Sequence, residues 1–304
     1  MNKGIRDLDS MPIDIKIKYS KILSLMAFID NDYSQLKIGA FYRIINKIQL
    51  PSSHRIQLLN NIIRKEICFE EVFKEMDIDE ILNFQERNIF RFSLMKDLII
   101  IINADYIVTE NEKRLLKDIQ NYFDISEEQL SFFEDEYEMD RCFFDGNIGK
   151  NKFEEITKNA VSTAAGLGIP LALICYSGTF KGLGYFGTVS GLRAVGRKKK
   201  TGKYALAVGI GASIALGIAT YKALEYMIHI KKDENDKLLD LTKESMESLH
   251  RGTIDILQED MNYFSNRGVD HNHGNEQEVK NSLEIVGLLK RVVAILENTG
   301  PVLI

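Results

Sequence analysis

Residues 98–112, LIIIINADYIVTENE, contain the most informative pattern for the fold of this chain. Four consecutive isoleucines belong to a strongly apolar segment, an Asn-Ala-Asp turn follows, and Glu110 and Glu112 begin the next segment. Acidic side chains favour the positive N-terminal end of a helix. The stretch therefore predicts two helices joined by a short acidic turn.

Apolar residues recur at helical spacing throughout residues 11–149, and no segment there alternates as a strand would. Pro51-Ser52 and Ser126-Glu127 are typical starts of further helices, because proline suits an early turn and serine can cap free N–H groups. We therefore predict an all-α bundle of six or seven helices over residues 11–149.

The acidic turn has a counterpart 75 residues earlier in the chain. Each half reads as a helix, an acidic turn, a second helix, a short turn and a third helix, so two similar halves would bury their apolar faces together. The matching pairs are Leu23 and Leu98, Met26 and Ile101, Asp30 and Asp105, Ala40 and Leu115, Phe41 and Leu116, Ile44 and Ile119, Ile48 and Phe123, and Leu50 and Ile125.

Asp105 and Glu112, seven residues apart, carry a resemblance to a known family. With the Ile125-Ser126 turn, residues 20–134 resemble the TerB-like, tellurite-resistance type of helical domain. Its motif is an Ala-Asp-Gly turn with a glutamate seven residues after the aspartate. Two positions depart from it: Tyr106 stands where the family has glycine, and Lys37 stands where the first half should have the glutamate.

The resemblance implies that the acidic turn binds a metal ion or joins the helices. Asp105 and Glu112 are then candidate ligands of a divalent cation, with Glu110 nearby. Hard cations take several oxygen ligands, and these carboxylates are few. The alternative is that Asp105 caps the following helix while Glu110 and Glu112 favour its N-terminal end. Capping is the commoner use, so we expect no obligatory cofactor.

Residues 159–230 form a glycine-rich region with two uncharged segments, 159–180 and 204–221, which predict a hydrophobic helical hairpin. Their length is close to that of a membrane-spanning helix. The alternative is a pair of helices buried in a soluble core or an oligomer. Small residues four apart let helix backbones approach closely; they are Gly178 and Gly182, Gly187 and Gly191, and Gly209, Ser213 and Gly217.

A basic cluster separates the two segments: Arg197, Lys198, Lys199, Lys200 and Lys203. Such clusters stay on the cytoplasmic side, and the N-terminus has no apolar core typical of a signal peptide. A plain two-span hairpin would place the first domain outside. We therefore expect either an interfacial hairpin with the cluster on anionic headgroups or a longer embedded part that includes residues 182–192. Both predict a cytoplasmic protein at the inner membrane.

Residues 231–304 predict two amphipathic helices, over 231–267 and 275–297, because apolar residues follow a helical register in both. They would form a hairpin that packs on itself, on the first domain or on another copy. The fold prediction is thus a TerB-like bundle, a glycine-rich hydrophobic hairpin and a C-terminal amphipathic hairpin.

Several functions are excluded or disfavoured. A net charge of −5 argues against broad nucleic-acid binding. Residues 182–187 match GxGxxG but lack the strand that a dinucleotide site needs. Asp270-His271-Asn272-His273 reads as a polar turn. Three widely spaced cysteines without a CxxC pair indicate a reducing compartment. No nucleophile–base pair or cofactor loop is recognisable, so we expect no enzyme.

The expected function is a sensor or scaffold subunit. TerB-like domains recur in bacterial stress-response and anti-phage systems, and the glycine-rich region resembles modules of such proteins. The first domain would recruit other subunits and the glycine-rich region would engage an anionic membrane. The alternative is a soluble interaction module whose glycine-rich helices are buried in a homo-oligomer.

Overall fold

The computed structural model describes residues 11–30, 33–64, 66–74, 77–144, 163, 166–167, 169, 233–269 and 276–299. Every regular element in these ranges is a helix, which confirms the all-α class. The glycine-rich stripe and the basic cluster lie outside the described residues, so their roles stay predictions. These are Gly178, Gly182, Gly187, Gly191, Gly209, Ser213, Gly217, Arg197, Lys198, Lys199, Lys200 and Lys203.

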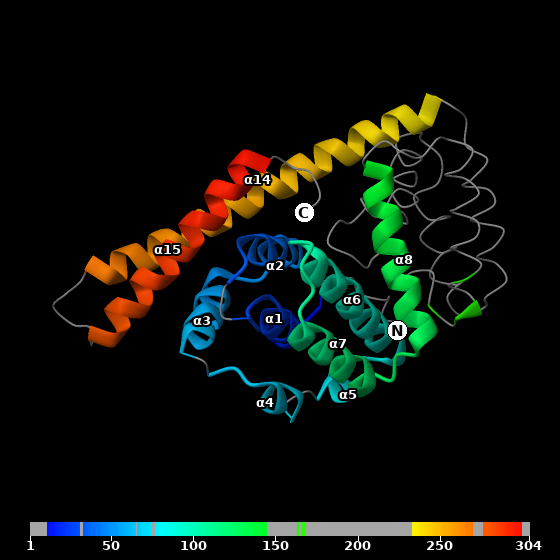
Figure 1. The fold of residues 1–304 in the computed structure, drawn as a ribbon, viewed down its shortest axis with the longest axis horizontal. Coiled ribbons are helices and arrows are strands. Elements are labelled where there is room, and N and C mark those ends of the chain that lie inside the picture. Colours follow the sequence, from blue (N-terminus) through cyan, green and yellow to red (C-terminus); the bar gives the residue numbers. More distant parts are fainter. Residues whose placement is uncertain are drawn as a thin grey trace, which may run out of the picture.

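The first domain is a bundle built around α1 and α6, which pack against each other (Figure 1). Each of these two central helices also contacts the two helices that follow it in its own half. Two short helices, α4 and α5, connect the halves. Apolar periodicity did not predict them as separate helices, because each is too short to show a helical repeat. The helices are α1 (Ile13–Ala27), α2 (Gln35–Lys47), α3 (Ser52–Ile63), α4 (Phe69–Lys74), α5 (Ile78–Ile81), α6 (Phe84–Asn103), α7 (Glu110–Tyr122) and α8 (Glu127–Phe144).

The two halves repeat each other at an offset of 75 residues. Helices α2 and α7 have 13 residues each, and both their ends differ by this offset. The same turn follows each helix: Gln49 and Asp124 have φ angles of 56° and 50°. Leu50 N donates to Ile45 O at 3.0 Å, and Ile125 N donates to the matching oxygen of Gln120 at 3.0 Å. The predicted duplication is confirmed.

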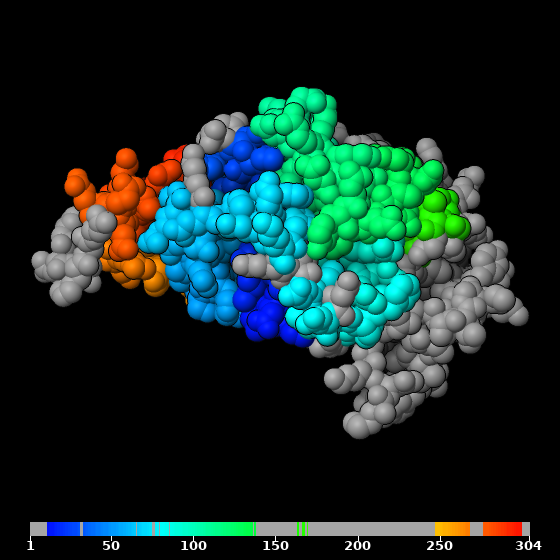
Figure 2. Space-filling model, turned by 90° about the horizontal axis from the view of Figure 1, so that it is seen from below, coloured from blue at the N-terminus to red at the C-terminus, as the bar shows by residue number. Residues whose placement is uncertain are grey.

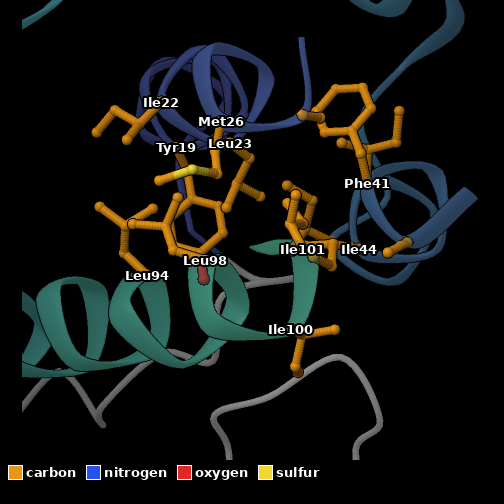
Figure 3. Close-up of a cluster of buried hydrophobic side chains, with 14 of the residues drawn as sticks. Tyr19, Ile22, Leu23, Met26, Phe41, Ile44, Leu94, Leu98, Ile100 and Ile101 are labelled. Atoms are coloured by element: carbon orange, nitrogen blue, oxygen red, sulfur yellow. The ribbon is translucent and has the colours of Figure 1, made fainter. Parts of the chain in front are cut away.

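Matching residues of the two halves meet in the core. Leu23 and Met26 of α1 and Leu98 and Ile101 of α6 are all fully buried. Figure 3 shows these side chains pointing into one cluster between α1, α6 and α2. Tyr19 lies in the same cluster and donates a hydrogen bond to Asp97 Oδ2 at 2.7 Å. Each half by itself would expose these apolar faces to solvent, so the two halves form one hydrophobic core together.

The C-terminal helices α14 (Asp233–Val269) and α15 (Glu276–Thr299) form the predicted antiparallel hairpin (Figure 1). The hairpin lies on α2 and α3, at one end of the first domain (Figure 2). The sequence left three possible packing partners for these helices. Two of them are found in the structure: the helices pack on each other and on the first domain.

The hairpin removes the symmetry between the halves. Every residue from Lys37 to Ile45 of α2 is buried, because the bundle covers one face and the hairpin covers the other. The matching helix α7 buries only Glu112, Leu115, Ile119 and Gln120. One copy of the repeated helix is thus a docking surface, and the other copy faces solvent.

Candidate functional site

The acidic turn between α6 and α7 binds the ammonium group of a lysine side chain from the first half, Lys37. Lys37 Nζ lies 2.5 Å from Glu112 Oε1 and 3.2 Å from Asp105 Oδ1. It also donates to the carbonyl oxygen of Ile107 at 2.9 Å. The side chains of Lys37 and Glu112 are 6% and 0% exposed, so the ammonium group sits in the interior of the turn. A lysine of the first half thereby fastens the turn of the second half.

Burial disfavours a charged lysine, but here the neighbouring acceptors outweigh it. Desolvation lowers the pKa of Lys37, while the hydrogen bonds that it donates to Glu112 and Asp105 raise it, and the net result is a pKa above its ordinary value of 10.5. Lys37 therefore stays charged. A buried ion pair is stable only when its remaining polar atoms are also bonded, and the Ile107 carbonyl meets that need on the ammonium side.

Thr109 begins α7 as its N-cap. Glu112 N donates to Thr109 Oγ1 at 3.2 Å, and Thr109 N donates to Glu112 Oε2 at 2.8 Å, which makes a capping box. Asp105 Oδ1 instead accepts from Ile107 N at 3.1 Å inside the turn. The interpretation of Asp105 as the cap was therefore wrong, because the chain needs four more residues to reach the helix start. Glu112 uses one oxygen for the cap and the other for Lys37.

The two predicted cation ligands, Asp105 and Glu112, are brought together by the fold. Glu110 is not part of that group; it is exposed and pairs with Lys113 at 2.6 Å. Within the part of the chain that the structure describes, no three or more His, Cys, Asp or Glu residues are placed to hold a metal ion. A divalent cation at this turn would compete with Lys37 for the same oxygens. Its binding stays a prediction.

A second polar site joins the hairpin to the first domain. Arg55 of α3 donates to both oxygens of Asp260 on α14, with Nε–Oδ2 and Nη2–Oδ1 distances of 3.0 and 2.8 Å. Tyr42 of α2 donates to Asp260 Oδ2 at 3.0 Å. Arg55 also donates to the carbonyl of Leu50 at 2.9 Å. We call Tyr42, Arg55 and Asp260 the latch.

The latch is buried. Tyr42 and Asp260 are fully shielded from solvent, and Arg55 is 5% exposed. Burial raises the pKa of Asp260 above its ordinary value, although Arg55 and Tyr42 oppose the shift. The pKa of Tyr42 is raised by burial and by the adjacent Asp260. Bidentate Arg–carboxylate geometry is specific as well as strong, so the latch fixes how α14 sits on α2 and α3.

Beside the latch, α2 presents further polar groups to α14. Asn46 Nδ2 lies 3.3 Å from both Leu249 O and Thr253 Oγ1. Arg43 Nη2 lies 3.5 Å from His250 Nδ1, and Arg43 Nη1 has no hydrogen-bond partner. Burial lowers the pKa of Arg43 to about 10. The hairpin thus meets α2 through a mixture of apolar and buried polar contacts.

Sequence reasoning missed the latch and the role of Lys37. Lys37 was noted only as a departure from a motif, although its offset of 75 from Glu112 was visible. A comparison of α2 with α7 carries the missing signal. At positions that match two solvent-facing charges of α7, α2 has a small and an aromatic residue. The matched pairs are Gly39 and Arg114, and Tyr42 and Lys117.

No protein-family model matches the chain, and neither a curated protein nor a solved structure does so. Among the helices that the structure describes, none has the length and apolar character needed to cross a membrane.

Proposed function

We propose that this chain is a non-enzymatic sensor or scaffold subunit of a bacterial stress-response or anti-phage defence system. The resemblance of residues 20–134 to TerB-like domains supports the class of system. In this proposal the first domain recruits other protein subunits, and the glycine-rich region brings the assembly to the inner membrane.

One observation carries the scaffold role: a single helix connects the glycine-rich region with the latch. Helix α14 begins at Asp233, soon after that region ends at residue 230, and continues without interruption to Asp260 and beyond. At 1.5 Å per residue, the helix from Asp233 to Asp260 is about 40 Å long. The latch holds α14 against α2 and α3. A displacement of α14 caused by binding at its glycine-rich end would therefore be transmitted to the first domain.

Cell fractionation tests the membrane part of the proposal. Full-length protein should remain with the membranes after a carbonate wash, which removes peripheral proteins. Recovery of all the protein in the soluble fraction would overturn membrane engagement. A soluble, stable oligomer in that fraction would instead support the alternative of glycine-rich helices buried between copies.

A functional assay tests the small-residue stripe. Gly209→Leu combined with Gly217→Leu should abolish protection or toxicity in the host, because leucine prevents close helix approach. The matched control is Ile210→Leu with Ile218→Leu, one residue further along and therefore on another face. If the glycine variant behaves like the control, the stripe has no role in the activity.

A further inference from the structure

The turn between α6 and α7 displays apolar side chains to solvent. Tyr106, Ile107 and Val108 are 67%, 65% and 38% exposed. We call these three residues the knuckle. Single exposed apolar residues are ordinary on a protein surface, but contiguous ones often mark an interaction site.

The knuckle is held in one conformation by its polar neighbours. Lys37 Nζ binds the carbonyl oxygen of Ile107, and Asp105 Oδ1 accepts from the N–H of the same residue. Tyr106 N donates to Asn103 O at 3.2 Å. Tyr106 has a φ of 61°, a left-handed conformation that costs a bulky residue free energy. A strained, pre-organised turn that carries outward apolar side chains is characteristic of a binding element.

An apolar pocket opens beside the other acidic turn. It has a volume of about 320 Å³ and lies between α1, α3, α4 and α7. Its wall is formed mainly by Phe28, Ile29, Tyr33, Ile67, Phe69 and Leu115, with the free thiol of Cys68 at the same wall. Most of these side chains are only partly buried, so the pocket presents aromatic and aliphatic surface to an incoming group.

The knuckle and the pocket belong to neighbouring turns. Asn111, in the first turn of α7, donates to Asp30 Oδ1 at 3.4 Å, which joins the second acidic turn to the first. Lys37 lies in α2, just after the acidic turn of the first half, and its Nζ donates to the carbonyl oxygen of Ile107 in the knuckle. Leu115 of α7 lies in the pocket wall. An apolar projection and an apolar hollow therefore share one end of the bundle.

We propose that this end of the bundle is a homotypic interface, in which the knuckle of one copy enters the pocket of a second copy. A twofold axis between the two features makes the same contact twice, because each copy contributes one projection and one hollow. Ile107 is the central anchor and Val108 packs beside it. The aromatic and aliphatic wall of the pocket matches the chemistry of these side chains.

The charges around the knuckle favour a protein over a lipid surface. Next to it, in the first turn of α7, Glu110 pairs with Lys113. An anionic bilayer selects a basic rim, whereas this rim has both signs. A protein interface readily leaves such mixed charges at its solvated edge while its centre stays apolar.

Sedimentation of the full-length protein over a range of concentrations tests the interface. In a detergent that keeps the protein dispersed, we expect Ile107→Asp and the pocket-filling Cys68→Trp each to raise the dimer Kd at least tenfold. Leu283→Asp, at an apolar residue of α15 that is 58% exposed, is the matched control and should leave the Kd unchanged. A mixture of the two interface variants should regain dimers, because one intact contact forms between them.

Cross-linking locates the contact. One tagged copy carries Ile107→Cys and Cys68→Ser, the other keeps Cys68, and both carry Cys142→Ser and Cys175→Ser. Mild oxidation should join position 107 of one copy to Cys68 of the other, as identified by mass spectrometry. Leu283→Cys in place of Ile107→Cys should give at most background linkage.

Three outcomes would overturn this interface: a wild-type protein that stays monomeric, a Kd that Ile107→Asp leaves unchanged, or linkage no greater than in the control. Loss of vesicle binding in Ile107→Asp without any change in self-association would also overturn it and assign the knuckle to lipid. Neither measurement depends on stress or phage-defence activity, so failure here is distinct from failure of the proposed function.

Discussion

Lys37 and Glu112 occupy matching positions in the two halves of a duplicated domain, and they bind each other with an Nζ–Oε1 distance of 2.5 Å. Two carboxylates at these positions would repel each other unless a cation lay between them. Because the first half has lysine at this position, its ammonium group takes the place of a bound metal ion and neutralises the carboxylate. The turn of the second half is then stabilised by a residue of the first half.

Removing the ammonium group should destabilise the protein strongly. In Lys37→Met, Glu112 is left buried without its partner, which costs about 3–5 kcal/mol of unfolding free energy. Urea unfolding measures the loss. Lys113→Met, which removes an exposed partner of Glu110, is the control and should cost about 0–1 kcal/mol. Glu112→Gln should partly rescue Lys37→Met, and simple additivity of the two losses would contradict the pairing.

The same geometry makes a prediction about divalent ions. In Lys37→Ser, Asp105 and Glu112 lose the competing ammonium group, so millimolar Ca²⁺ should raise the melting temperature of the variant more than that of the wild type. Thermal unfolding with and without Ca²⁺ measures the difference. The triple variant Lys37→Ser, Asp105→Asn, Glu112→Gln serves as the reference without a site. Equal shifts in all three proteins would show that the ion acts elsewhere.

Gly39 allows the hairpin to approach α2. A Cβ atom at this position would lie 3.3 Å from Leu296 Cδ2 of α15. Gly39→Leu should therefore overpack the interface, cost about 1–3 kcal/mol and speed hydrogen exchange in α15. Gly287→Ala is the control, because its new methyl group meets only Arg291 Nη1 at 3.7 Å. Replacing a helical glycine should stabilise by about 0.5–1 kcal/mol. Unchanged exchange in Gly39→Leu would contradict the close packing.

Docking of the hairpin should weaken in mild acid. Burial and then the positive charge of Arg43 lower the pKa of His250 below its ordinary 6.5, while a hydrogen bond with the Leu296 backbone opposes the shift. A lowered histidine pKa stabilises the folded state above pH 6.5, and this contribution is lost as the pH falls through the folded-state pKa. Protonation would place a second positive charge beside Arg43.

Hydrogen exchange in α14 and α15 at pH 7.5 and pH 5.5 measures this effect. We expect faster exchange at the lower pH after correction for intrinsic rates. His250→Gln should remove the pH-dependent part, whereas His54→Gln, in α3 with an exposed contact to Ser53, should keep it. The same acid response in both variants would assign the effect to other groups.

The local features of the fold were accessible from the sequence because they depend on residues a few positions apart. Apolar periodicity predicted α1, α2, α6 and α7. The helix start at Ser126 is confirmed by its hydrogen bonds with Gln129. The start of α7 was placed correctly, but its cap was assigned to Asp105 instead of Thr109, since both residues have suitable side chains and only the backbone geometry distinguishes them.

The helical class, the repeat of 75 residues and the C-terminal pair of amphipathic helices were all predictable from the amino-acid pattern. Each of these follows from periodicity and capping, which act within one or two helical turns. The packing of the helices in three dimensions was needed to show which copy of the repeated helix is covered and which charged group lies in the acidic turn. Tyr42 and Asp260 are 218 residues apart and Lys37 and Glu112 are 75 apart. No local pattern connects such residues, because their interaction exists only when packing brings distant helices together.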